Sequence, residues 1–144
     1  MFDYIKSEYP LPDNPPEWVT RHAREGVFQT KDTDAQYMET YTITADGRLV
    51  HHAVRYEGVP ETERPYWGKP EWERPFGKFA GCLRTVPMGD IELADFHGDL
   101  YFYTCDEDSP RNFFEYVARF TNGRLQHIKC IRAGKAAVED GSEK

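Results

Sequence analysis

The sequence predicts an α+β domain dominated by antiparallel β-sheet, and three observations favour this class. Two dipeptides, Asp46-Gly47 and Asn122-Gly123, each separate two runs in which apolar and polar residues alternate. Such dipeptides accept the positive φ angles of a tight hairpin turn. Only one segment has helical character, and strands that follow each other closely in sequence usually pair. We therefore expect consecutive hairpins arranged as a meander, one short N-terminal helix, and a long Pro/aromatic loop over one face.

The hairpin turns also predict a register. A two-residue loop places Tyr41 opposite His52 in the first hairpin and Ala118 opposite His127 in the second. Both histidines would then share the apolar face of their hairpin. The segment "DIELADFHGDLYFY" is expected to form a third hairpin that turns around residues 97–99.

The helix is predicted in "DNPPEWVTRHAREG". Asn14 is expected as the N-cap, Pro15 at the first helical position, and Gly26 as the terminator. Trp18 and His22 are four residues apart and would share the buried face. The following segment, "GVFQTKDTDAQY", is expected to add a strand.

The length of 144 residues is sufficient for one domain with one core, which we place over residues 1–132. The polar segment 133–144 is expected to be a flexible tail. The first twelve residues lack the pattern of a secretory signal, and no apolar stretch is long enough to span a bilayer. The three cysteines are far apart in sequence, so we expect reduced thiols in a cytoplasmic protein.

Charge is unevenly distributed along the chain. The net charge of −7 argues against nucleic-acid binding through a broad basic face. Residues 88–108 contain seven acidic residues and no Lys or Arg, whereas residues 111–135 contain six basic residues and one acidic residue. Two interpretations are open: complementary charges pair across neighbouring strands, or an acidic edge is presented to a basic partner.

No pattern of catalytic or metal-binding residues stands out. There is no Cys-x-x-Cys, no zinc-finger spacing, no Gly-x-Ser-x-Gly and no glycine-rich phosphate loop. His51 and His52 are adjacent, so in a strand they point to opposite faces and do not readily share an ion. We therefore assign no catalytic residue, no metal and no cofactor, and we leave open whether the protein is an enzyme.

The most unusual segment is "RPYWGKPEWERPFGKF", residues 64–79. Its prolines keep the chain extended, and its large rings are too numerous to be left entirely in water. Either all of them pack internally, or some remain available to a partner, as Trp, Tyr and Arg often do at interfaces. The candidate partner-binding residues are Tyr66, Trp67, Trp72, Arg74 and Phe76, together with Asp95 and Asp99 of the acidic segment.

Several segments together resemble a group of small uncharacterised proteins encoded by bacteria and their phages. They are "MFDYIKSEYPLP", "FQTKD", "YTITADGRL", "DFHGDLYFY" and "EYVARFTNGRLQ". The long proline–aromatic loop is not part of the resemblance. The resemblance implies a cytoplasmic protein of phage or mobile-element context. No activity is established for the group, so it assigns no catalytic residue.

Three functions are consistent with these observations. The first is a non-enzymatic protein-interaction protein that docks a partner through the aromatic loop and the acidic hairpin, with inhibition of that partner as one form of its action. The alternative is a small-molecule-binding domain or minor enzyme with a pocket between sheet and loop, lined by Tyr41, His52, Tyr101 and His127. The third is an assembly component that associates through an unpaired strand edge.

Overall fold

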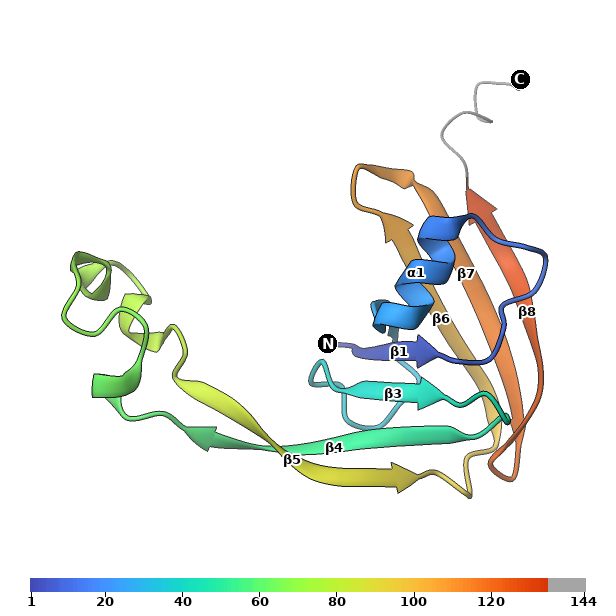
Figure 1. Cartoon of the computed structure of the whole chain (residues 1–144), viewed down its shortest axis with the longest axis horizontal. Coiled ribbons are helices and arrows are strands. Elements are labelled where there is room, and N and C mark those ends of the chain that lie inside the picture. Colours follow the sequence, from blue (N-terminus) through green and yellow to red (C-terminus); the bar gives the residue numbers. More distant parts are fainter. Residues whose placement is uncertain (135–144) are drawn as a thin grey trace. The chain divides into compact units, whose positions relative to one another are not determined.

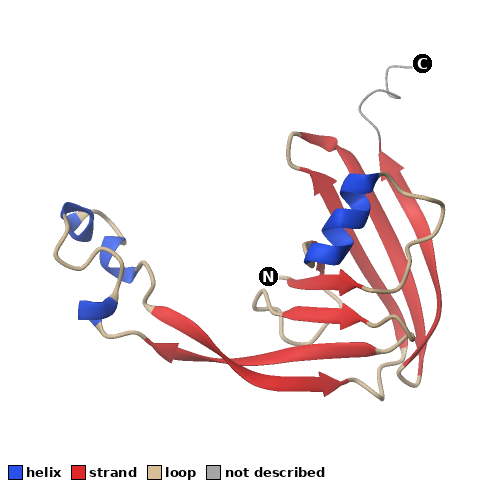
Figure 2. Ribbon diagram, viewed as in Figure 1, coloured by secondary structure: helices blue, strands red, loops and turns tan. Residues whose placement is uncertain are grey.

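The computed structural model describes residues 1–134, which form an eight-stranded mixed sheet, one α-helix and three short 3-10 helices (Figures 1 and 2). The elements are β1 (Asp3–Ser7), α1 (Glu17–Glu25), β2 (Phe28–Thr30), β3 (Thr40–Ile43), β4 (Leu49–Gly58), η1 (Glu61–Glu63), η2 (Pro70–Glu73), η3 (Gly77–Phe79), β5 (Leu83–Glu92), β6 (Gly98–Asp106), β7 (Ser109–Thr121) and β8 (Arg124–Gly134). The predicted α+β class, dominated by β-sheet, is confirmed.

The chain divides into two compact units. We call Met1–His52 with Asp90–Lys144 the body, and Ala53–Gly89 the insert. Strands β4 and β5 begin in one unit and end in the other. The single domain expected over residues 1–132 thus comprises two units. Strand β8 continues to Gly134, and the rest of the expected tail, residues 135–144, lies outside the described residues.

The strand order is β5-β4-β3-β1-β2-β6-β7-β8, which departs from the expected meander. Strand β1 lies between β2 and β3 and runs parallel to β3. The predicted hairpin around residues 97–99 is wrong, because β5 and β6 are not neighbours in the sheet. Instead β6 pairs with β2 and, through the turn after Asp106, with β7.

Helix α1 ends as predicted but begins later. Gly26 has a φ of 74°, and its N–H donates to the carbonyl of His22, which terminates the helix. The N-cap is Pro16 rather than Asn14. Pro15 cannot take the first helical position because the proline that follows it disfavours α-helical backbone. Trp18 and His22 are in contact, with ring centroids 5.3 Å apart.

The first hairpin has a longer loop than predicted, and this changes its register. Tyr41 lies opposite His51, not His52. Of the loop residues only Gly47 has positive φ (84°), as in a three-residue turn with a bulge. The loop is closed by Thr44, whose hydroxyl accepts the N–H of Arg48 at 2.9 Å. The shift by one residue exchanges the faces of β4.

The second hairpin has the predicted turn. Asn122 and Gly123 both have positive φ (49° and 79°), as a type I′ turn requires. The pairing then shifts on β8, so that Ala118 lies opposite Ile128 instead of His127. A β-bulge inserts one residue and exchanges the inner and outer faces of the strand beyond it. Ile128 is therefore buried, and His127 is exposed.

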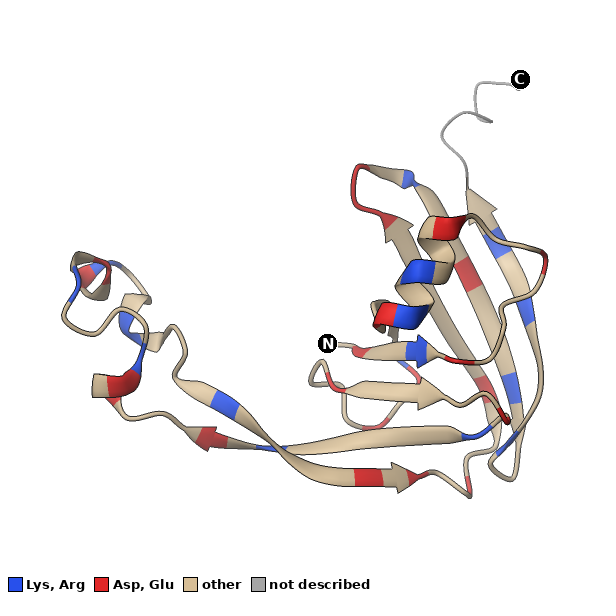
Figure 3. Cartoon of the chain, in the orientation of Figure 1, with Lys and Arg blue, Asp and Glu red and all other residues tan. Residues whose placement is uncertain are grey.

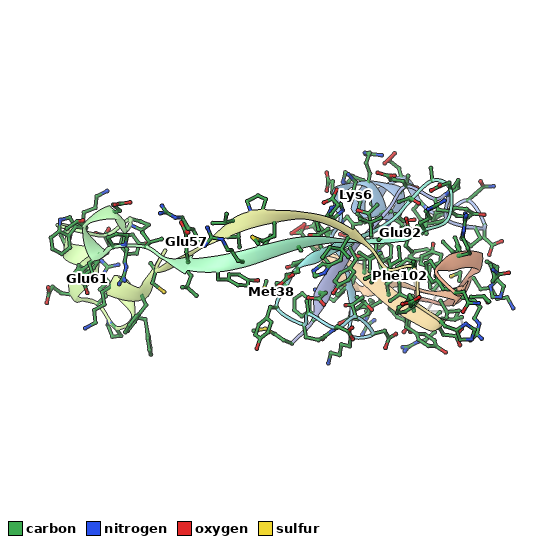
Figure 4. All side chains as sticks on the ribbon, turned by 90° about the horizontal axis from the view of Figure 1, so that it is seen from below. Lys6, Met38, Glu57, Glu61, Glu92 and Phe102 are labelled. Carbon is green, nitrogen blue, oxygen red and sulfur yellow. The ribbon has the colours of Figure 1, made fainter. Side chains whose placement is uncertain are left out.

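An aromatic cluster occupies the core of the body. Phe28, Phe102 and Tyr116 are all 0% exposed, and their ring centroids are 5.3–5.9 Å apart. Phe102 is among the side chains labelled in Figure 4. Trp18 of α1 packs on Phe114 at 5.7 Å, so the helix extends this cluster. The large rings supply much buried area, which suits a small core.

The two glycine turns meet at one end of the body. The N–H of Leu125 donates to the carbonyl of Gly47 at 2.8 Å, and the N–H of Gly123 donates to the carbonyl of Phe96 at 2.7 Å. A Cβ at Gly123 would lie 2.5 Å from the carbonyl oxygen of Ala94. This position therefore requires glycine both for its φ angle and for the close approach of the backbone.

Candidate functional site

The insert has almost no interior of its own. Among residues 53–89 only Gly77 is buried. Seven large apolar side chains are exposed there, from 37% for Tyr66 to 80% for Phe76. They are Tyr56, Tyr66, Trp67, Phe76, Phe79, Leu83 and Met88. An isolated two-stranded hairpin is only marginally stable in water. Because these side chains stay exposed, they add little hydrophobic stabilisation to the insert.

The segment that the sequence suggested as a long loop is held together by backbone hydrogen bonds. The N–H of Val59 donates to the carbonyl of Cys82 at 2.8 Å and closes the segment at its base. Within it, Arg64 donates through Nε to the carbonyl of Val59 and through Nη1 to that of Lys78, both at 2.9 Å. A Cβ at Gly77 would overlap the carbonyl oxygen of Glu71, so the chain passes itself closely here.

The aromatic side chains of the insert form two pairs. Trp67 and Trp72 meet edge to face with centroids 5.3 Å apart, and Trp72 is the more buried of the two. Phe76 and Phe79 lie 6.4 Å apart, and the Lys78 ammonium lies 5.7 Å from the Phe79 ring centroid. Despite these contacts, Trp67, Phe76 and Phe79 stay 47%, 80% and 53% exposed.

Phe76 adopts a backbone conformation that bulky residues rarely take. Its φ is 64° and its ψ is 4°, in the left-handed region. This conformation costs a residue with a side chain about 1–2 kcal/mol. The side chain is nevertheless 80% exposed, so its own burial does not compensate for the strain. Strained backbone of this kind occurs preferentially at functional sites.

Residues of both charge signs are spread along the insert (Figure 3; Glu57 and Glu61 are labelled in Figure 4). The insert contains six basic and five acidic residues. Glu57 accepts a hydrogen bond from Arg84 at 2.6 Å and lies 3.1 Å from the Arg55 guanidinium. The hydrogen bond from Arg84 lowers the pKa of Glu57 below its ordinary value.

The sequence-derived partner residues fall in both units. Tyr66, Trp67, Trp72, Arg74 and Phe76 lie in the insert; four of them are exposed, and Trp72 is half-buried. Asp95 and Asp99 lie in the body. Asp99 faces Arg119 across the β6–β7 pair, with an ion pair of 3.4 Å. This ion pair agrees with the first of the two interpretations, whereas Glu92 pairs with Arg48, outside the basic segment.

The four residues expected to line a ligand pocket do not do so. Tyr41 is 1% exposed in the core and stacks on His51 at 4.3 Å. Tyr101 and His127 are exposed on outward-facing positions. None of the four lines the cavities of about 300, 340 and 420 Å³ in the described part of the body. The inward positions expected of His52 and His127 depended on the two registers corrected above.

His52 instead joins a hydrogen-bonded chain across three strands. Its Nε2 lies 2.6 Å from the Thr42 hydroxyl, and its Nδ1 lies 2.7 Å from an Asp90 carboxylate oxygen. A hydroxyl, an imidazole and a carboxylate in this order resemble a nucleophile with its base. Thr42 is only 4% exposed, however, and a nucleophile must be reachable by its substrate. We interpret the chain as a structural link between β3, β4 and β5.

The hydrogen-bond partners of two buried polar side chains could not be predicted from the sequence. The Asp3 carboxylate is fully buried and accepts four hydrogen bonds from the loop before β3. His22 is 8% exposed, and its Nδ1 lies 2.7 Å from the Thr104 hydroxyl. The helical spacing correctly placed His22 on the buried face. Its partner, 82 residues away, is a tertiary contact that no local pattern predicts.

Comparisons with family models, with curated proteins and with solved structures found no match to this chain. No helix within residues 1–134 is long and apolar enough to cross a membrane. Within the same residues, no group of three or more His, Cys, Asp or Glu side chains is placed to hold a metal ion. The candidate site therefore depends on the geometry and exposure of the insert.

Proposed function

We propose that this chain is a non-enzymatic protein-interaction protein that docks a protein partner through the aromatic surface of the insert. The observation that carries the proposal is the exposure of seven large apolar side chains in a unit whose only buried residue is Gly77. Soluble proteins rarely leave so much apolar surface in water unless it is covered by a partner. Tyr, Trp and Arg, which dominate interface energetics, are all present there.

Phe76 is the residue we expect at the centre of the interface. It is the most exposed large apolar side chain of the insert, and its backbone is strained. Glycine would relieve the strain and would lose only a ring contact with Phe79. Folding alone therefore does not account for a phenylalanine here. Insertion of this ring into a pocket of the partner would account for it, since buried aromatic anchors carry much of the affinity of interfaces.

The charges of the insert support a protein as the partner. Six basic and five acidic side chains nearly cancel, so this unit lacks the positive field that nucleic-acid binding requires. The acidic segment of the body contributes less than the sequence suggested, since Asp99 is paired with Arg119. The phage or mobile-element context implied by the resemblance makes inhibition of the partner one form that this binding could take.

The test is capture of proteins from a bacterial host extract by the tagged chain and its Phe76→Gly variant, followed by affinity measurement with the purified partner. We expect Phe76→Gly to fold normally, with the insert slightly stabilised, and to lose at least about tenfold in affinity, as loss of a hot spot does. Tyr37→Ala is the matched control, because Tyr37 is a 65%-exposed aromatic residue of the body.

Equal affinity of Phe76→Gly and the unchanged chain would exclude the insert as the docking surface. Equal losses in both variants would indicate unspecific adhesion of exposed rings. Light scattering on both proteins shows whether the partner is a second copy of the chain. Strands β5 and β8, at the two ends of the sheet, offer edges for such self-association.

A further inference from the structure

A second site lies in the body, where a cavity of about 340 Å³ opens beside α1. Its wall combines Tyr4 of β1, His22 and Glu25 of α1, Gln29 of β2, Tyr103 of β6 and Glu107 of the following turn. The volume is within the range of small-molecule sites. No Lys or Arg contributes to the wall. The cavity is thus bordered by two carboxylates whose charges are not balanced by a Lys or Arg of the wall.

His22 offers the cavity a polar atom that the protein itself does not use. The side chain is buried, with 8% of its surface exposed, and Nδ1 is 2.7 Å from the Thr104 hydroxyl. Nε2 has no hydrogen-bond partner within residues 1–134. Nε2 is not one of the fully buried side-chain atoms left without a partner, so it stays accessible and is available to a ligand in the cavity. When Nδ1 carries the proton and donates to Thr104, Nε2 is an acceptor.

The carboxylates and phenols of the wall can also accept hydrogen bonds. Neither Glu25 nor Glu107 forms an ion pair in the described part of the chain. The Tyr103 hydroxyl donates its proton to Gln29 at 3.0 Å, which leaves its oxygen free to accept. Tyr4 and Tyr103 add aromatic rings, and rings attract cations through their faces. The wall offers few hydrogen-bond donors, so we expect it to bind an anionic ligand weakly.

We propose that this cavity binds an organic cation with a guanidinium head group, either as a free small molecule or as an arginine side chain of a peptide. A guanidinium has five N–H donors and no acceptor, which complements a wall of carboxylate, imidazole and phenol acceptors. Its hydrogen bonds to carboxylates are charge-assisted and therefore strong. The proposal is independent of the insert and of the protein interaction proposed above.

The test is an NMR titration of the ¹⁵N-labelled full chain with ethylguanidinium, with N-ethylurea as the neutral probe of similar shape. We expect ethylguanidinium to shift the signals of His22 and Gln29 saturably, and N-ethylurea to leave them unchanged. The double variant Glu25→Gln, Glu107→Gln keeps the shape of the cavity and removes its charge. It should bind ethylguanidinium about tenfold or more weakly, as expected for loss of charge-assisted hydrogen bonds.

Glu17→Gln is the control, because it removes one negative charge from the same helix without contributing to the cavity wall. We expect its affinity to remain within about twofold of the unchanged chain, since exposed charges are screened by salt. A blocked Gly-Arg-Gly peptide separates the two sources of the ligand: tighter binding than ethylguanidinium indicates an arginine of a peptide, and equal binding indicates a free small molecule.

The proposal is overturned if no signal shifts saturably, if both probes act alike, or if the double variant and Glu17→Gln bind ethylguanidinium equally. A further variant keeps the test independent of the carboxylates. His22→Phe fills a similar volume but removes Nε2. If it folds, as its amide spectrum will show, it should weaken binding several-fold, and unchanged binding would exclude the role assigned to His22.

Discussion

Replacing Asp3 by asparagine tests how the loop before β3 is built. The carboxylate is 0% exposed. One oxygen accepts the Thr33 hydroxyl and the Gln36 N–H, both at 2.7 Å, and the other accepts the N–H groups of Tyr37 and Glu39 at 3.0 and 3.1 Å. Four donors therefore converge on a group that has only acceptors. An asparagine of the same shape presents one acceptor and one donor.

The magnitude of the loss follows from which contacts the amide can keep. With its oxygen toward Tyr37 and Glu39, its NH₂ faces Thr33 and Gln36. The Thr33 hydroxyl can rotate and accept, but the Gln36 N–H cannot. One charge-assisted hydrogen bond is lost, worth about 1.5–3 kcal/mol, and one buried N–H is left without an acceptor, at about 1–3 kcal/mol. Burying a neutral amide is easier than burying a carboxylate, which offsets part of this loss. We expect a net destabilisation of about 2–4 kcal/mol.

The same carboxylate also holds backbone strain in place. Gln36 and Met38 have φ angles of 55° and 63°, in a region that costs non-glycine residues about 1–2 kcal/mol each. When the hydrogen bonds weaken, the loop can relax to other conformations. We therefore expect the Gln36 amide to exchange with solvent much faster in Asp3→Asn, while amides of β7 lose protection only in proportion to the global stability.

The assay is urea denaturation followed by circular dichroism, with amide exchange by NMR. Thr33→Val is the control, because it removes one of the four donors and leaves the carboxylate its other three. We expect it to cost about 1 kcal/mol. A midpoint for Asp3→Asn within the error of the unchanged chain, or a loss equal to that of Thr33→Val, would refute the view that the carboxylate organises this loop.

Three further changes have expected outcomes. Tyr116→Phe should leave the free energy of unfolding unchanged or raise it by up to about 1 kcal/mol in urea denaturation, because the buried hydroxyl has no hydrogen-bond partner within residues 1–134. Burial also raises the pKa of this hydroxyl, so in the unchanged chain absorbance should show no ionisation of Tyr116 above pH 10 until the protein unfolds. Gly123→Ala should destabilise by about 1–3 kcal/mol more than Gly47→Ala in the same assay. Both residues have positive φ, but the added Cβ would lie 2.5 Å from a backbone oxygen at Gly123, whereas its nearest contact at Gly47 is a side-chain carbon at 3.3 Å; equal losses would contradict the close approach. The pKa of Glu57 is lowered in the folded insert, so its ion pair with Arg84 stabilises the fold at pH values above the ordinary pKa of 4.5, and this stabilisation is lost as the pH falls through the lower folded pKa. NMR titration of Glu57 should therefore give a midpoint below pH 4.5, and Arg84→Gln should raise it. An unchanged midpoint in that variant would contradict the assignment.

Local chemistry was predictable wherever a feature depends on a few adjacent residues. Asn122-Gly123 forms the expected turn, and Gly26 ends the helix, because positive φ is decided by the residue itself. The start of the helix was mispredicted although the evidence was local: the Pro15-Pro16 pair already excluded Asn14 as the cap. The aromatic residues of 64–79 were identified from the sequence as candidates for partner binding. The sequence left open whether their rings pack internally or remain exposed to a partner.

The sequence by itself determined the class of the fold, because alternation and turn residues act over short distances and need no partner elsewhere in the chain. The tertiary structure decided the rest. One extra residue in the Gly47 loop placed His51 instead of His52 opposite Tyr41, and one bulge on β8 turned Ile128 inward instead of His127, since side chains alternate at every residue of a strand. The contacts of Asp3 and His22 join segments that are distant in sequence. No periodicity encodes such contacts, since they arise only when packing brings the segments together.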